Sequence, residues 1–284
     1  MNEIFEKFVK MEGDNFKPVF KYYKRKKPPP DLTFVLDPYS NNEKFKPIKS
    51  LCSLSNHTYL KDSEEWQISF LEHGIHIIHN PFSIQGIAYW TLRCLKDFSQ
   101  SVNNLKNPHW WSRLEAEPQL VHKLRWATLG YHHDWDTKEY QTDQPNWQFP
   151  EDLSQLCQVL LGQIPNIPGS GTFQAEAAIV NFYPMDATLS GHKDFSEPNK
   201  SAPLVSISLG QSAIFLIGGP DKSQKPEAII LRSGDVLIMS HRARQSFHAV
   251  PKILPSSETE FTSDTSQNEY LKTHRININI RQVF

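Results

Sequence analysis

The sequence contains few cysteines and no long apolar run. Its three cysteines, Cys52, Cys94 and Cys157, lie far apart and form no Cys-x-x-Cys pair. Such an odd, scattered set argues against a disulfide framework and indicates reduced thiols in an intracellular protein. No apolar stretch approaches the ~18 residues that a membrane-spanning helix requires, so we expect no membrane contact. The first ten residues mix acids with bases and lack the apolar segment of a secretory signal.

The chain also lacks an excess of charge of either sign. It has 30 Lys and Arg residues against 31 Asp and Glu residues, which gives a net charge of −1. This balance excludes a uniformly basic nucleic-acid coat protein but leaves room for a local basic patch. Aromatic side chains are plentiful, and 17 Phe, 9 Tyr and 7 Trp among 284 residues argue against a largely disordered chain. That length suffices for one large domain or two small ones.

Residues 1–30 are expected to form an N-terminal helix and a basic linker. Apolar side chains recur at helical spacing over residues 2–10, which predicts a short amphipathic helix. A basic run at residues 21–27 follows, and the prolines at 28–30 then end any helix and form a stiff connector. The basic run has three open interpretations: a nuclear-import signal, a nucleic-acid contact or a solvated face.

Residues 31–120 are expected to form a helical extension that could contact nucleic acid. Within it, apolar side chains at helical spacing predict a helix over about residues 81–101.

Residues 121–284 are expected to form the main domain. A helix begins in it near Pro150, with Asp152 as its N-cap. An acidic, Ser- and Thr-rich stretch at 255–269 has no periodicity and predicts a surface loop. The remaining chain reads as many short strands separated by Gly and Pro turns, which is typical of a sandwich or barrel. These predicted strands cover residues 178–183, 204–209, 212–217, 228–231, 235–239 and 275–281.

Two histidines and one aspartate form a candidate metal site. In an extended segment alternate side chains share a face, so His192 and Asp194 can coordinate one metal ion. His248 follows the predicted strand 235–239 and supplies a third ligand. Two His and one carboxylate match the facial triad of non-haem Fe(II) oxygenases, which leaves positions open for cosubstrate and O₂. A zinc site would more often be closed by a fourth protein ligand or hold one water.

The last predicted strand carries a polar face beside this candidate site. Arg275, Asn277, Asn279 and Arg281 alternate with three isoleucines, so the polar four share one face. A half-polar strand next to a metal needs an anionic occupant, and Arg is the side chain suited to two-point binding of a carboxylate.

These residues resemble the signature of the AlkB-type Fe(II)/2-oxoglutarate dioxygenases. His192-x-Asp194, His248 and Arg275-x5-Arg281 stand in that family's order, and Asn181-Phe182-Tyr183 matches its Asn-x-Tyr element. The resemblance runs from about residue 120 to the end of the chain. Further stretches resemble one branch of this family more specifically, namely residues 123–131, 210–216, 248–251 and 270–273.

The resemblance implies an α+β fold with a double-stranded β-helix (jelly-roll) core and N-terminal buttressing helices. It implies that His192, Asp194 and His248 bind Fe(II) and that Arg275 pairs with the distal carboxylate of 2-oxoglutarate. It further implies a position for Arg281 near Asp194, which it helps to orient. Hydrogen bonds to the cosubstrate would come from Asn181, Tyr183 and Asn277.

The resemblance also implies the activity. Such an enzyme uses Fe(II), 2-oxoglutarate and O₂ to oxidise methylated bases, and it acts on tRNA and on unpaired or bubbled DNA. The implied reactions are demethylation of N1-methyladenosine, oxidation of 5-methylcytidine to 5-formylcytidine, and demethylation of N6-methyladenine. The alternatives are a protein (histone) lysine demethylase or hydroxylase that uses the same metal site, and a binding module without turnover. We expect a monomer in the nucleus and/or mitochondrion, with the cytoplasm as a further location.

A flipped base needs flat side chains around it, and basic side chains must meet its phosphates. The resemblance places Tyr131, His132 and His133 at the substrate pocket, and Trp110 could add a stacking wall. Arg242 and Arg244 precede His248 and would share one face if extended. Phosphate contacts are expected from these two, from the basic run 21–27, and from Lys123 and Arg125.

Overall fold

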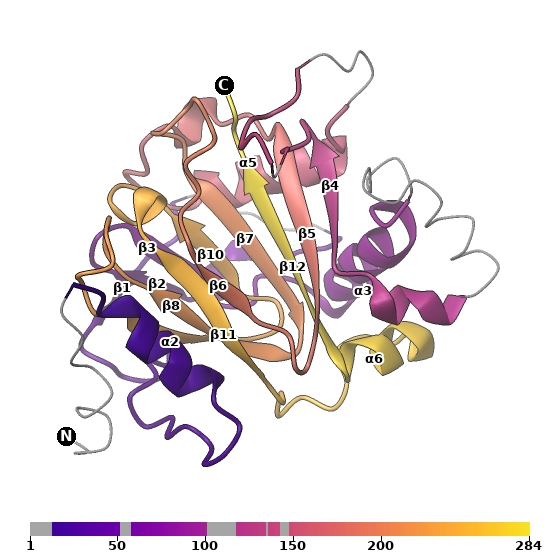
Figure 1. Cartoon of the computed structure of the whole chain (residues 1–284). Coiled ribbons are helices and arrows are strands. Elements are labelled where there is room, and N and C mark those ends of the chain that lie inside the picture. The colour runs from indigo at the N-terminus through magenta and orange to yellow at the C-terminus, as the bar shows by residue number, and fades with distance from the viewer. Residues whose placement is uncertain (1–12, 52–57, 101–117, 135, 143–147) are drawn as a thin grey trace.

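Two antiparallel sheets face each other in the computed structural model, which describes residues 13–51, 58–100, 118–134, 136–142 and 148–284 (Figure 1). The larger sheet contains, in spatial order, β1 (Phe45–Ile48), β2 (Ile68–Leu71), β3 (Ile75–Ile78), β10 (Val236–Met239), β7 (Leu204–Gly210), β12 (His274–Arg281), β5 (Ala177–Pro184) and β4 (Trp126–Gly130). The smaller sheet contains β6 (Leu189–His192), β11 (His248–Leu254), β8 (Ser212–Ile217) and β9 (Glu227–Leu231). This arrangement is a double-stranded β-helix, as predicted.

One face of β12 is apolar and the other is polar, and this difference places the larger sheet between the helices and the smaller sheet. Its isoleucines Ile276, Ile278 and Ile280 are fully buried and join the largest apolar cluster of the described residues. That cluster fills the space between the sheet and the helices α3 (Ile84–Leu92) and α5 (Glu151–Gly162). The polar residues of the strand therefore face the other way, into the space between the two sheets.

Helices cover the outer faces of both sheets. On α2 (Phe16–Lys24), buried Phe16, Val19, Tyr22 and Tyr23 pack on the smaller sheet, and Figure 1 shows this helix lying across it. On the other side α6 (Thr265–Leu271) lies next to α3, whose last turn continues as a π-helical turn at Arg93–Asp97. Short 3-10 turns occur at Ser63–Glu65, Pro118–Lys123, Ser170–Thr172 and Ala243–Gln245. None of the helices in the described part of the chain is long and apolar enough to cross a membrane.

Several sequence predictions change at this level. All six predicted strands are present, but the described part of 31–120 is not a helical extension, because β1, β2 and β3 add three strands to the main sheet. The predicted helix over 81–101 begins only at Ile84. The predicted surface loop 255–269 is wrong at its end, where Asp264 caps α6 through a bond from the Gln267 amide. The predicted helix at residues 2–10 lies outside the described residues.

Candidate metal centre and active site

Three side chains converge at one end of the smaller sheet. His192 is the last residue of β6, His248 is the first residue of β11, and the two are directly opposite in the antiparallel ladder. Asp194 follows two residues after His192. Nε2 of His192 lies 3.8 Å from Oδ1 of Asp194, and Nε2 of His248 lies 3.9 Å from Oδ2. All three donor groups fall within 4.8 Å of one another, so the structure brings the three predicted ligands together.

Both imidazoles are held in the tautomer that a metal requires. Nδ1 of His192 lies 2.9 Å from the carbonyl oxygen of Ser190, and Nδ1 of His248 lies 3.1 Å from the carbonyl oxygen of Ser246. A carbonyl can only accept, so each Nδ1 carries the hydrogen and each Nε2 presents its lone pair to the site. Two imidazole nitrogens and one carboxylate on one side of an ion suit Fe(II).

Asp194 is kept ionised by the charges around it. Burial alone would raise the pKa of this carboxyl, but the Arg281 guanidinium and both histidines outweigh that effect and hold the pKa below its usual range. Nη2 of Arg281 lies 3.0 Å from Oδ2 of Asp194. For His248, burial and the nearby His192 lower the pKa to about 4, against the attraction of Asp194. Asp194 and His248 are therefore deprotonated at neutral pH, which metal binding requires.

Glu197 is a buried carboxylate that the sequence analysis did not single out. It accepts from Nη2 of Arg244 at 3.1 Å and from the Tyr140 hydroxyl at 2.7 Å. It also lies 3.3 Å from Nε of Arg281. Burial would raise its pKa, but Arg281 and Arg244 prevail over burial and over the nearby Asp194 charge, so the pKa is lowered. Glu197 thus contacts Arg281 through Nε, whereas Asp194 contacts it through Nη2.

A buried guanidinium without a counter-ion lies deeper between the sheets. Arg275 donates to Ser208 Oγ at 2.7 Å and to the Gln211 carbonyl oxygen at 3.1 Å, and its Nε has no partner. Tyr183 lies opposite Arg275 in the β5–β12 ladder, and its buried hydroxyl also lacks a partner. No carboxylate of the described residues forms an ion pair with Arg275. A buried cation beside an unpaired hydroxyl fits the distal carboxylate of 2-oxoglutarate.

The asparagines of β5 and β12 differ in whether their amide groups are already hydrogen-bonded within the protein or line the cavity. Asn277 donates to Ser206 Oγ at 2.8 Å and to the Ile207 carbonyl oxygen at 3.1 Å, so its amide nitrogen is committed to β7. Asn181 lies opposite Asn277 and lines the cavity beside the ligands. Asn279 also lines it, and its buried Oδ1 has no partner.

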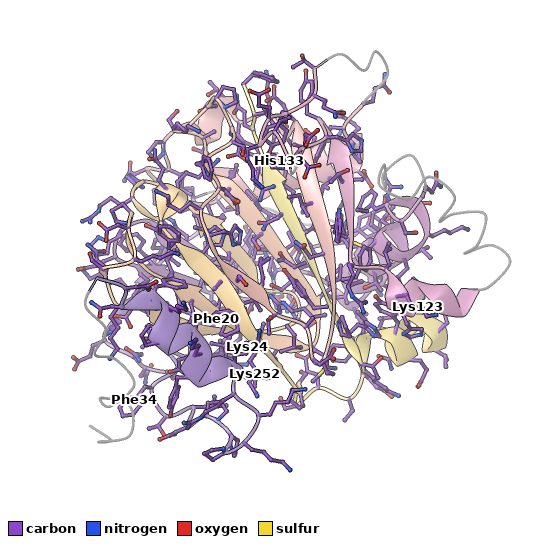
Figure 2. The ribbon with its side chains drawn as sticks, viewed as in Figure 1. Phe20, Lys24, Phe34, Lys123, His133 and Lys252 are labelled. Atoms are coloured by element: carbon purple, nitrogen blue, oxygen red, sulfur yellow. The ribbon has the colours of Figure 1, made fainter. Side chains whose placement is uncertain are left out.

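A cavity of about 530 Å³ is lined by two of the three ligands, His192 and Asp194. His133, Lys138 and Tyr140 form part of its wall. Nε2 of His133 lies 2.8 Å from Ser196 Oγ, and its ring meets Tyr140 edge-on at 5.2 Å. Figure 2 shows His133 at one end of the molecule, over the ends of the central strands.

The other predicted base contacts lie outside this wall. Tyr131 packs its ring against Phe284 at 5.2 Å. His132 is buried and bonds the Thr128 hydroxyl. Trp110 lies outside the described residues. Of the described members of this predicted set, His133 alone lines the cavity.

The predicted pairing of Arg242 and Arg244 as phosphate contacts on one face is not what the structure shows. Arg242 and Arg244 do not share an extended face, because Ala243–Gln245 is a 3-10 turn. Arg242 is exposed, whereas Arg244 is 2% exposed and bonds Glu197 and the carbonyl oxygen of Asp194, so it is placed to hold the site rather than a phosphate. Figure 2 shows Lys123 beside α6, far from His133.

Phe16 of α2 reaches the ligand-bearing strand from outside. A Cβ placed on Gly191 would lie 2.8 Å from its ring, and one placed on Gly218 would lie 2.9 Å from it. Only glycine at these two positions lets the ring lie this close to the backbone next to His192. No local sequence pattern predicts this contact, because residues 16 and 191 are far apart in the chain.

Comparisons with known proteins agree with this geometry. The sequence profile of the 2OG-Fe(II) oxygenase superfamily matches residues 74–281. The human protein named nucleic acid dioxygenase ALKBH1 is 33% identical over 331 aligned residues, which cover 95% of this chain and 84% of that protein.

Two other relatives match a shorter part of the chain. The tRNA demethylase abh1 of Schizosaccharomyces pombe is 44% identical over 168 residues, 58% of this chain and 55% of its own. The DNA N(6)-methyladenine demethylase ALKBH1A of Arabidopsis thaliana is 43% identical over 175 residues, 58% of this chain and 50% of its own. The solved structure of OsALKBH1 superposes with a TM-score of 0.54 at 21% identity, over 76% of this chain and 99% of that one, which supports the fold.

Proposed function

The chain belongs to the 2OG-Fe(II) oxygenase superfamily, and within it to the AlkB homologue 1 family, and we propose that it oxidatively demethylates nucleic-acid bases. The observation that carries this proposal is the convergence of His192, Asp194 and His248, together with the buried Arg275, which forms no ion pair among the described residues and whose Nε has no partner. A nucleic-acid substrate is supported by the names of the relatives, which include a nucleic acid dioxygenase, a tRNA demethylase and a DNA demethylase. The proposed substrates are methylated tRNA and N6-methyladenine in unpaired or bubbled DNA.

The family's cofactors are Fe(II), 2-oxoglutarate and O₂. Together they supply, when bound, the oxidising power that hydroxylates a methyl C–H bond and leaves succinate and CO₂. His192, Asp194 and His248 would hold the metal, and Arg275 with Tyr183 would hold the far carboxylate of the cosubstrate. We further propose that Asn181 and Asn277 contact or support the cosubstrate, as the resemblance implies.

The chain's own contribution is position and charge. The backbone carbonyl oxygens of Ser190 and Ser246 fix the two imidazoles, so that both ligand nitrogens face the same point. Arg281 keeps the Asp194 carboxylate ionised and fixed in orientation. The side chains of Asp194, His248 and Arg281 are largely buried, which strengthens the charge interactions among them.

The methyl group would lie in the cavity lined by His133 and Tyr140. A hydroxylated methyl on nitrogen collapses and releases formaldehyde, whereas one on a ring carbon persists and can be oxidised again. This difference separates the proposed demethylation of N1-methyladenosine from the oxidation of 5-methylcytidine.

The basic run at residues 21–27 supports a nucleic-acid contact. Its first four residues complete α2, and Lys21 and Lys24 are exposed. Figure 2 shows Lys24 near Lys252 of β11, so charge from two elements gathers on this side. An exposed basic run is equally suited to nuclear import, and we propose the nucleus or mitochondrion as the location.

The function is tested by following succinate formation with two substrates. One is a tRNA stem-loop that carries N1-methyladenosine, and the other is a methyl-lysine peptide. We expect the stem-loop alone to increase succinate, with one formaldehyde released per turnover, and His248→Ala to abolish both signals. Coupling with the peptide alone would refute the nucleic-acid proposal and favour a protein demethylase.

A further inference from the structure

Phe195 directly follows the ligand Asp194 and is exposed to an unusual degree. It is 59% exposed, the highest value among the large apolar side chains of the described residues. It also belongs to the wall of the cavity beside the ligands. An exposed apolar ring in the wall of a cavity gains from a partner that covers it.

The backbone that carries this ring is fixed on both sides. The carbonyl oxygen of Asp194 accepts from Nη1 of Arg244 at 2.9 Å. On the other side, Ser196 Oγ lies 2.8 Å from His133 Nε2, and Glu197 is held by Tyr140 and Arg244. The ring of Phe195 therefore projects from an anchored segment, so a ligand that stacks on it orders little additional chain.

Within the described residues, no second aromatic ring and no cation contacts the Phe195 ring. Cationic side chains stand nearby. Lys138 is exposed on the same cavity wall. Lys193 belongs to the same wall, and its ammonium bonds the Pro220 carbonyl oxygen at 3.0 Å. The Lys200 ammonium bonds the carbonyl oxygen of Phe195 itself. A flat and anionic partner matches an exposed ring in a segment with these cations around it, and an unstacked nucleotide has both properties.

We propose that Phe195 is the platform on which the nucleotide next to the target base stacks. This inference rests on the proposed function, since it assumes that the target base occupies the cavity. The neighbouring nucleotide would then lie against the solvent-exposed part of the cavity wall that Phe195 forms. Phe195 would thereby favour single-stranded or bubbled substrates, whose neighbouring base is free to leave the helical stack.

The test uses the full chain and a short single-stranded DNA with N6-methyladenine beside 2-aminopurine, a base whose fluorescence is quenched by stacking. The variants are Phe195→Ala, Phe195→Leu and Phe195→Trp. Phe34→Ala is the matched control, because Phe34 is another exposed phenylalanine, 42% exposed, and Figure 2 shows it far from His133. Affinity is measured without O₂ at several salt concentrations, with Fe(II) and 2-oxoglutarate present.

We expect Phe195→Ala and Phe195→Leu to weaken binding by roughly 5- to 150-fold, the fold-change of ~1–3 kcal/mol per stacked base. Both should also reduce the quenching of 2-aminopurine, while Phe195→Trp retains affinity and quenching. The slope of log affinity against log salt should stay the same, because no phosphate contact is removed. The loss in kcat/KM should shrink when the substrate is a single methylated nucleoside, which has no neighbour to stack.

Two failures are distinguishable. If the wild-type chain neither binds nor demethylates the oligonucleotide, the proposed function fails and the inference fails with it. If the wild-type chain does both and Phe195→Ala behaves like Phe34→Ala, the inference alone is overturned. Wild-type affinity in Phe195→Leu would also overturn it, because leucine offers an apolar surface without a ring to stack on.

Discussion

Replacing Arg281 with glutamine removes a charge from the point where two buried carboxylates meet. The guanidinium of Arg281 is 3.0 Å from Asp194 and 3.3 Å from Glu197, and all three side chains are largely buried. Breaking a buried pair by removal of one partner costs about 3–5 kcal/mol, because the remaining charge stays desolvated. For a chain of this size each kcal/mol corresponds to about 2–4 °C, so we expect Arg281→Gln to lower the melting temperature by roughly 10 °C.

The same substitution should weaken metal binding. Without Arg281, the burial of Asp194 is opposed only by the more distant positive charges, so its pKa rises and protons compete with the metal. Arg281→Lys keeps a positive charge and should recover part of the stability and of the Fe(II) affinity. The control is Lys44→Gln, which breaks an exposed pair of 2.6 Å with Glu227 and should cost at most about 1 kcal/mol.

Stability is measured by chemical and thermal unfolding of the metal-free protein, and Fe(II) affinity by anaerobic titration. A free energy of unfolding for Arg281→Gln within about 0.5 kcal/mol of the wild-type value, which is the range of an ordinary surface substitution, would refute the reasoning.

Three further predictions follow from the same geometry. Gly191→Ala should destabilise the protein by about 1–3 kcal/mol, because its Cβ would meet the Phe16 ring at 2.8 Å. Phe16→Leu should reduce that penalty in a double-mutant cycle, and additivity of the two would contradict the contact. Arg275→Gln should raise the KM for 2-oxoglutarate by roughly 30-fold or more, since it removes the buried cation that would bind the cosubstrate; an unchanged KM would contradict its assignment. Burial raises the pKa of Asp235 to about 6, against bonds from Tyr39 and the Arg232 amide, so folding takes up a proton between pH 4 and 6. Stability should fall by up to about 3 kcal/mol as pH rises through that range and flatten above it; an equal slope in Asp235→Asn would contradict this.

Local alternation made the reactive centre predictable. His192 and Asp194 share a side because they are two residues apart, and the polar face of β12 is visible in the sequence because isoleucines fill every other position. The alternation of β12 depends on strand geometry, whereas Asp194 lies just beyond the end of β6 and is also held by Arg281 and Arg244.

Features that depend on distant contacts were not predictable. Glu197 is held in the site by bonds from Arg244 and Tyr140. These residues are far apart in the chain, so no residue spacing in the sequence predicts the contact. Arg244 was misplaced because a 3-10 turn replaces the assumed strand. The three strands between residues 45 and 78 are four residues each, too short for a clear alternation amid polar chain.

The central claim is that His192, Asp194 and His248 hold one metal ion with 2-oxoglutarate clamped at Arg275. The most direct measurement is anomalous diffraction from anaerobic crystals grown with Mn(II), which replaces Fe(II), and 2-oxoglutarate. We predict one anomalous peak among the three side chains, with density for the cosubstrate running from that peak to Arg275 and Tyr183. A peak at any other group of residues, or a cosubstrate that leaves Arg275 without a carboxylate partner, would contradict the account.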